Sequence, residues 1–267
     1  DVERSRGLGD VYKRQGRYPV CMESPSRVIA ALSSLAAVLL VAGCTIGPGA
    51  TGSQATSNPS SGPGQSTDDS DDVEGTLLDD GRMFAVVTWG SSTCVPQVDT
   101  VTAEGQTVSV TLVEPESEGD GEKACTADLA SRASVGALPE GVDPTKEITL
   151  QVTYGDVVDD VDLDGDPSFT GTPGSSTEYA PTAGWFDDGS LVLLTWGSSS
   201  CAPVVEDLEG SGASGTATFA TDDDQVCTMD MAPRATILEF GEDAVDDDAF
   251  TLTLVGGGLD GTVEVRG

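Results

Sequence analysis

The chain has no histidine and few cationic or aromatic residues. Lysine and arginine together number 12 against 46 aspartate and glutamate residues, and aromatic residues make up 5% of the sequence. Without histidine, Ser-His-Asp and Cys-His catalytic arrangements and histidine-ligated zinc sites are excluded. The formal net charge of −34 repels nucleic acid and anionic lipid, so we expect no nucleic-acid partner.

One apolar segment, Val28 to Leu40, has the length of a signal-peptide core and is too short to cross a bilayer as a helix. Arg27 precedes it, and the residues VAGC follow it and end at Cys44. In this motif the chain resembles the bacterial lipoproteins, whose lipobox places an aliphatic residue and two small residues before a cysteine. The resemblance implies a diacylglyceryl group on Cys44, cleavage before Cys44, and a mature extracytoplasmic protein anchored to the cell membrane by its lipid.

The composition changes on both sides of this signal. Residues 1–21 contain RGLGDVYKRQ, which is similar to translated adapter sequence, so we interpret them as a non-native leader and residues 22–43 as the lipoprotein signal peptide. Residues 44–75 are rich in Ser, Gly, Pro and Thr and then in Asp, which is typical of a flexible linker. The acidic, lysine-poor composition resembles that of secreted actinobacterial lipoproteins of unknown function.

After the linker, the same unit occurs twice. TWGSSTCVP at 88–96 returns as TWGSSSCAP at 195–203, and CTADLASR at 125–132 returns as CTMDMAPR at 227–234. The first pair of segments is offset by 107 residues and the second by 102, so one copy is shorter within the loop near 114–122. Gene duplication is the simplest explanation of this pattern.

Each unit carries two cysteines at equivalent positions, Cys94 and Cys125 in the first and Cys201 and Cys227 in the second. An exported chain enters an oxidising compartment, where an even number of cysteines favours disulfides over metal ligands or nucleophiles. We expect one disulfide within each unit, and a bond between the units is the alternative.

The spacing of apolar residues is typical of strands. Apolar and polar residues alternate over 108–112, 148–154 and 250–254, which predicts strands with one buried face. Residues 83–87 and 191–194 are more uniformly apolar, which predicts central strands buried on both faces. We therefore predict an all-β fold of two tandem small antiparallel β-sandwich domains of immunoglobulin-like type, at 76–166 and 184–267, with six or seven strands each and a linker at 167–183.

Trp89 and Trp196 are the strongest candidates for a ligand-binding surface, together with the serines that follow them: Ser91, Ser92, Ser198 and Ser199. An aromatic ring beside hydroxyl groups can stack on a sugar or hold a peptide, which predicts a glycan or protein ligand. The alternative, which we favour, is that each indole packs in a core. The position resembles the tryptophan that packs on the disulfide of immunoglobulin-like domains, although the spacing differs.

Two pairs of charged residues also occupy matching positions in the units. Arg132 follows Asp128 by four residues, and Arg234 follows Asp230 in the same way. We predict a structural ion pair in each unit, and an anion-binding site is the alternative.

Asp160, Asp162 and Asp164 form the DxDxDG opening of an EF-hand calcium loop. The motif then fails, because position twelve is Gly171 instead of glutamate and no helical pattern flanks it. The 102-residue offset aligns the segment with TVEVRG at 262–267, which predicts a final strand. We expect these aspartates to form an exposed strand face, with a calcium site as the alternative and weak association of Ca²⁺ with the acidic surface.

The sequence predicts no cofactor and no enzyme, because no pair of carboxylates is singled out for acid–base chemistry. We expect a lipid-anchored, non-catalytic binding protein or cell-envelope component. The alternatives are a structural spacer on the cell surface, a calcium-dependent adhesion module and a carboxylate-based hydrolase.

Overall fold

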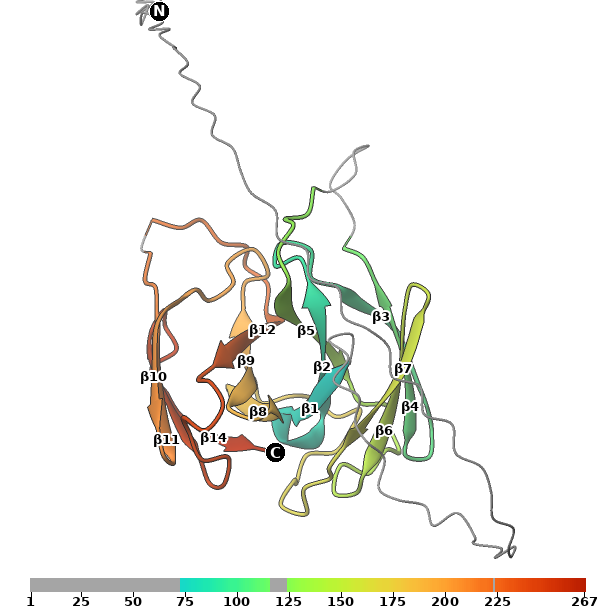
Figure 1. The fold of residues 1–267 in the computed structure, drawn as a ribbon. Coiled ribbons are helices and arrows are strands. Elements are labelled where there is room, and N and C mark those ends of the chain that lie inside the picture. The colour runs from blue at the N-terminus through green and yellow to red at the C-terminus, as the bar shows by residue number, and fades with distance from the viewer. Residues whose placement is uncertain (1–72, 116–123, 223) are drawn as a thin grey trace, which may run out of the picture. The chain divides into compact units, whose positions relative to one another are not determined.

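The computed structural model describes residues 73–115, 124–222 and 224–267. The signal peptide, Cys44 and the linker up to residue 72 lie outside the described residues. Within the described ranges there are fourteen strands, one short 3-10 turn at Asp79–Gly81 and no α-helix (Figure 1). The fold is therefore all-β, as the sequence predicts.

The first seven strands form two sheets. One is antiparallel and has the order β1-β2-β5, and the other has the order β3-β4-β6-β7. Strands β4 and β6 pair in parallel, because the chain leaves this sheet after β4, forms β5 in the other sheet and then returns. The prediction of purely antiparallel sheets is wrong at this pair. The strand bounds are β1 Glu74–Leu78, β2 Met83–Gly90, β3 Gln97–Glu104, β4 Thr107–Val113, β5 Ala130–Ala137, β6 Ile148–Tyr154 and β7 Val157–Leu163.

The last seven strands form one sheet with the order β10-β11-β13-β14-β8-β9-β12. Here β11 and β13 are the parallel pair that corresponds to β4 and β6. A second parallel pair, β14 and β8, joins the two groups of strands into one sheet. Its register pairs are Val265 with Ala183 and Arg266 with Gly184. The bounds are β8 Thr182–Asp187, β9 Ser190–Gly197, β10 Val205–Ser211, β11 Ser214–Phe219, β12 Ala232–Glu239, β13 Thr251–Gly256 and β14 Gly261–Arg266.

Buried side chains fall into three clusters. The first joins β1 and β2 to β4, β6 and β7, and includes Phe84 and Val86. The second lies among the last seven strands and includes Leu191 and Leu193. The third joins β2 to β9 and contains residues from both halves of the chain: Leu78, Met83, Ala85, Val87, Phe186, Val192 and Leu194.

The third cluster, which we call the shared cluster, explains the uniformly apolar segments at 83–87 and 191–194. Successive side chains of a strand point to opposite faces. Even-numbered Phe84 and Val86 enter the first cluster. Odd-numbered Met83, Ala85 and Val87 enter the shared cluster. The prediction that these strands are buried on both faces is confirmed, because each half covers the outer face of the other.

The segment between the halves packs against the first half. Phe169 is buried in the first cluster, and the Thr170 hydroxyl donates to Asp80 Oδ2 at 2.7 Å. Gly171 and Pro173 are also buried. The predicted linker at 167–183 thus contains no strand before β8 begins at Thr182, but it is part of the folded body.

Leu193→Ala and Leu194→Ala test the shared cluster, because these neighbours are both fully buried but face different clusters. We expect each substitution to lower the free energy of unfolding by about 2–5 kcal/mol, the usual cost of a leucine-sized cavity. Denaturant titration of the full chain measures both. If Leu194→Ala costs almost nothing while Leu193→Ala carries the full cost, the shared cluster does not hold the halves together.

Candidate functional site

The two halves differ where their three-stranded and four-stranded parts meet. In the second half β14 and β8 are hydrogen-bonded. In the first half the corresponding strands β7 and β1 lie side by side, and no ladder joins them in the described structure. A Cβ atom at Gly75 would lie only 3.1 Å from Leu163 Cδ2, so glycine permits this close approach. We call this boundary between β1 and β7, which no ladder crosses, the seam.

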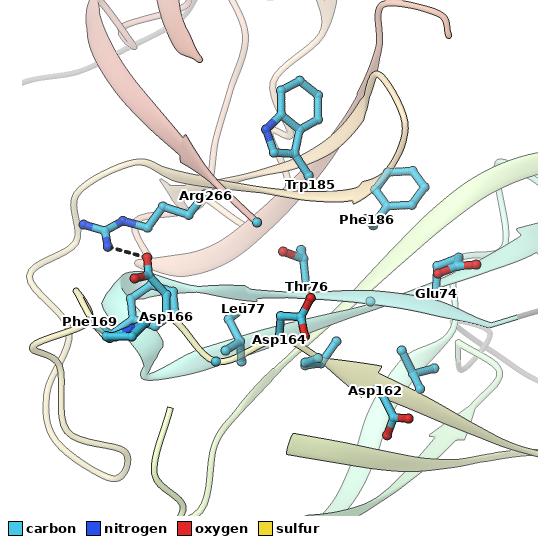
Figure 2. A pocket seen from close by; sticks show the side chains of 16 residues that line it. Glu74, Thr76, Leu77, Asp162, Asp164, Asp166, Phe169, Trp185, Phe186 and Arg266 are labelled. Carbon is cyan, nitrogen blue, oxygen red and sulfur yellow. Dashed lines mark hydrogen bonds and ion pairs between the residues drawn. The ribbon is translucent and has the colours of Figure 1, made fainter. Parts of the chain in front are cut away.

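A cavity of about 390 Å³ opens at the seam (Figure 2). This seam pocket is formed by β1, by the end of β7 and the residues after it, by β8 and by the end of β14. Its volume lies within the range of small-molecule sites. Figure 2 labels ten of the residues that line it: Glu74, Thr76, Leu77, Asp162, Asp164, Asp166, Phe169, Trp185, Phe186 and Arg266.

The seam pocket is acidic, because the described residues that line it include four carboxylates and one guanidinium. Arg266 Nη1 lies 2.9 Å from Asp166 Oδ2, and its guanidinium carbon lies 5.1 Å from the centre of the Phe169 ring. Burial alone would raise the pKa of Asp166, but hydrogen bonds from Ser168 and Arg266 outweigh it and lower the pKa. Asp166 therefore stays ionised and neutralises Arg266.

Two further acids of the seam pocket are Asp162 and Asp164. Asp164 has no hydrogen-bond or ion-pair partner among the described residues, and Figure 2 shows it facing Thr76. Asp162 accepts a hydrogen bond from the Thr149 hydroxyl at 2.8 Å. Both residues are exposed to solvent, and their negative charge attracts cations to this side of the pocket.

Apolar side chains form the rest of the seam pocket. Phe169 and Phe186 are 8% and 9% exposed, so most of each ring is fixed by packing. Trp185 also lines the cavity, but its ring points away from Asp162 and Asp164 in Figure 2 and contacts Phe250 edge-on at 5.2 Å. The seam pocket therefore combines acidic groups with two phenylalanine rings.

Asp79 lines an adjoining hollow of about 440 Å³ and is only 3% exposed. Its amide donates to the Thr182 hydroxyl at 3.0 Å, and its carboxylate accepts from the Thr177 hydroxyl at 2.9 Å. The other carboxylate oxygen, Oδ2, has no hydrogen-bond partner within the described structure. Burial raises the pKa of Asp79, although the Thr177 hydrogen bond and the charge of Arg82 oppose the rise.

The two predicted disulfides are present, Cys94–Cys125 and Cys201–Cys227, each within one half of the chain. Each closes a loop of a few tens of residues, which stabilises the fold by about 3 kcal/mol in the chain-entropy model. Next to each disulfide an arginine crosses the loop that follows β2 or β9.

The predicted ion pairs are wrong in their partners. Arg132 is 6% exposed, and its guanidinium donates to the carbonyls of Cys94 at 2.7 Å and Trp89 at 3.2 Å instead of to Asp128. Arg234 donates in the same way to Cys201 and Trp196, at 2.8 and 3.0 Å. Each guanidinium group therefore donates to backbone carbonyls where the strand ends, and not to the aspartate at the loop surface.

The structure explains why each TWGSS segment has glycine at its third position. A Cβ atom at Gly90 or Gly197 would lie 2.7 Å from the guanidinium carbon of Arg132 or Arg234. Both arginines therefore lie directly against a glycine backbone, which links the two repeated motifs of each half.

Asp128 and Asp230 fix the disulfide loops instead. Asp128 accepts from the Ser92 amide at 3.3 Å and from the Thr126 hydroxyl. Hydrogen bonds from Ser92 and Thr126 lower the pKa of Asp128 to about 2. Asp230 has the matching contacts with Thr228 and Ser199, which lower its pKa to about 2.

Trp89 and Trp196 lie partly buried against the shared cluster. Ser91 and Ser198 hydrogen-bond through their hydroxyls to Thr126 and Thr228. The backbone amides of Ser92 and Ser199 bind the aspartates, so all four serines belong to the hydrogen-bond networks of the disulfide loops. Part of each indole ring is buried by packing, and a ligand role for Trp89 and Trp196 stays a prediction.

Asp160 and Asp162 are exposed on β7, and Asp164 follows the strand. Asp160 and Asp162 thus lie on an exposed strand face as expected, whereas Asp164 lies just beyond the strand. In the described part of the chain, no group of three or more cysteine, aspartate or glutamate side chains is arranged to hold a metal ion.

The sequence analysis missed Glu74, Phe169, Phe186 and Arg266 as residues of a common pocket, because they lie far apart and share no motif. One signal was available. At the 102-residue offset Arg266 aligns with Asp164, so the two copies carry opposite charges at equivalent positions. The structure brings both residues to the seam pocket.

No protein-family model, no curated protein and no solved structure matches this chain. No helix among the described residues is long and apolar enough to cross a membrane. The candidate site is therefore defined by its geometry alone.

Asp79→Asn and Asp80→Asn should change stability in opposite directions. The folded-state pKa of Asp79 is raised, so its ionised form loses stability as pH rises above the ordinary value of 3.8. The pKa of Asp80 is lowered, despite its burial, by hydrogen bonds from Thr170, so its ionised form stabilises the fold above that pH. Asparagine tolerates the left-handed backbone at both positions.

Thermal denaturation of the full chain at neutral pH and near pH 3 measures these effects. We expect Asp79→Asn to have a higher midpoint than the parent at neutral pH and Asp80→Asn a lower one, with both differences shrinking in acid. An Asp79→Asn variant that is less stable than the parent at neutral pH would contradict the assignment.

Proposed function

We propose that this chain is an extracytoplasmic lipoprotein whose folded part is a non-catalytic binding body. The lipobox that ends at Cys44 supports the location, and the two disulfides suit an oxidising compartment. The absence of histidine from the whole sequence favours binding over catalysis.

We further propose that the folded part consists of two immunoglobulin-like sandwich units derived by gene duplication. Seven strands in each half follow one another in the same order, and each half has a parallel pair at the same place. The repeated TWGSS and Cys-Thr segments occupy matching strands and loops. The shared cluster joins the units.

The ligand that best fits the seam pocket is a small organic cation with an ammonium or guanidinium group. The observation that carries this proposal is the open seam between β1 and β7, where Asp164 has no partner in the described structure and Arg266 is already paired with Asp166. Phe169 and Phe186 offer apolar surface for the carbon atoms of such a ligand, and aromatic rings attract cations. The acidic surface raises the local concentration of cations.

Calorimetric titration of the full-length protein with choline, arginine and spermidine tests the seam pocket. We expect saturable binding of at least one probe, weakened by salt, because screening reduces attraction between charges. Asp164→Asn should weaken it by roughly tenfold, since one uncompensated charge contributes about 1.4 kcal/mol. Asp160→Asn is the matched control, because Asp160 is an exposed aspartate of β7, the strand that ends just before Asp164, and does not line the pocket.

Equal effects of the two variants would mean that the probes associate with the acidic surface in general. No binding of any probe would remove the proposed ligand class and would favour the alternative function, a spacer on the cell surface. A glycan or protein ligand at the disulfide loops would then remain to be tested separately.

Cys44→Ser tests the anchor, because serine cannot form the thioether that holds the lipid. We expect the parent protein in the membrane fraction with the mass of a lipidated chain that starts at Cys44, and we expect the variant unprocessed or released to the medium. Cell fractionation with mass spectrometry measures both. Cys21→Ser is the control and should change nothing, whereas membrane retention of an unlipidated Cys44→Ser protein would place the anchor elsewhere.

A further inference from the structure

The two matched tryptophans differ in their surroundings. Trp196 contacts Tyr179 edge-on, with ring centres 5.2 Å apart and planes at 85°. Trp89 has no such aromatic contact within the described residues. Tyr179 comes from the segment that joins the two halves. Within the described residues, the aromatic pair is thus found at Trp196 and not at Trp89.

A cavity of about 280 Å³ lies beside this aromatic pair. We call it the Trp196 cavity, and its lining includes Tyr179, Pro181, Trp196, Leu254, Asp260 and Thr262. It shares no lining residue with the seam pocket. Its size suits one small ring, since drug-sized ligands occupy larger sites.

A glycine turn borders this cavity, which Gly258 lines. Gly256, Gly257 and Gly258 all have positive φ, and a Cβ atom at Gly258 would meet nothing within 4 Å. The aligned turn of the first half is Tyr154–Asp156, where the Tyr154 hydroxyl bonds to Glu114 and the ring faces Arg132. Gly256 aligns with Tyr154, and a Cβ atom there would lie 2.5 Å from the Phe219 carbonyl oxygen, so the second half has no equivalent of the tyrosine side chain.

Tyr179 is held in an unusual conformation. Its φ is +59°, a left-handed value that a bulky residue rarely adopts, and its side chain remains 54% exposed. Its amide donates to the Thr177 hydroxyl at 3.0 Å, which fixes the turn. Strained residues with exposed side chains concentrate at binding sites.

We propose that the Trp196 cavity binds a single uncharged sugar ring. The apolar face of the ring packs on Trp196 and Tyr179, and its hydroxyl groups bind the Asp260 carboxylate and the Thr262 hydroxyl. Asp260 already accepts a hydrogen bond from the Gly256 amide at 3.1 Å, which orients its carboxylate at the cavity wall. An anionic sugar is disfavoured by the acidic surface. This site is independent of the seam pocket and of the cation proposed there.

Fluorine NMR of the full chain labelled with 5-fluorotryptophan tests the proposal, because the protein has only three tryptophans. Signals are assigned with Trp→Phe variants, and glucose, mannose and N-acetylglucosamine are titrated as probes. We expect the Trp196 signal to shift saturably with at least one sugar, while the signals of Trp89 and Trp185 stay unchanged.

Two variants make the test specific. Tyr179→Ala removes an exposed ring and should weaken binding by roughly tenfold. Gly261→Val places a side chain in open space beside the cavity, on a residue whose φ is not strained, and should block binding without loss of stability. Tyr154→Ala in the first half is the matched control and should leave binding unchanged.

Three results would overturn the proposal: no shift with any of the sugars, equal shifts at Trp89 and Trp196, or undiminished binding in the Gly261→Val variant. Each leaves the seam pocket and its cation unaffected. Failure of this site and failure of the proposed function are therefore distinguishable.

Discussion

The structure depends on covering both faces of two apolar strands. Because successive residues of β2 and β9 point to opposite sides, Phe84 and Leu193 enter separate cores, and Val87 and Leu194 are left on the outer faces. Neither half can bury that second face by itself. The shared cluster solves the problem for both halves at once. It also brings the ends of β14 and β8 to the side of β1, where the seam pocket forms.

Both candidate sites lie where the two halves differ, and the residues that the halves share have structural roles. Arg132 and Arg234 satisfy carbonyls at the ends of β2 and β9, and the adjacent glycines give them room. At the seam pocket, by contrast, Arg266 replaces an aspartate, and β14 pairs with β8 while no ladder joins β7 to β1 in the described structure. At the Trp196 cavity a glycine turn replaces Tyr154 and its neighbours. In this interpretation, duplication supplied a stable scaffold and later divergence supplied the sites.

Much of the scaffold could be predicted from the sequence, because strand period and cysteine number are local or arithmetic signals. The alternation at 148–154 marks β6, and the repeat identifies the partner of Cys94. Non-local geometry could not be predicted. The parallel pairing of β4 with β6 depends on the path of the chain through β5. Whether Arg132 donates to backbone carbonyls or to Asp128 depends on where its buried guanidinium group lies in the folded chain. The seam pocket joins four separate segments that share no motif, so it could not be read from the sequence.

If the shared cluster makes one cooperative body of the two halves, their central strands must open together. Hydrogen–deuterium exchange of the full chain in low denaturant measures this, because it reports the opening free energy of each strand. We expect the amides of β2 and β9 to exchange through the same global opening, with equal dependence on denaturant. Exchange of β2 through an opening that leaves β9 protected, or the reverse, would contradict it.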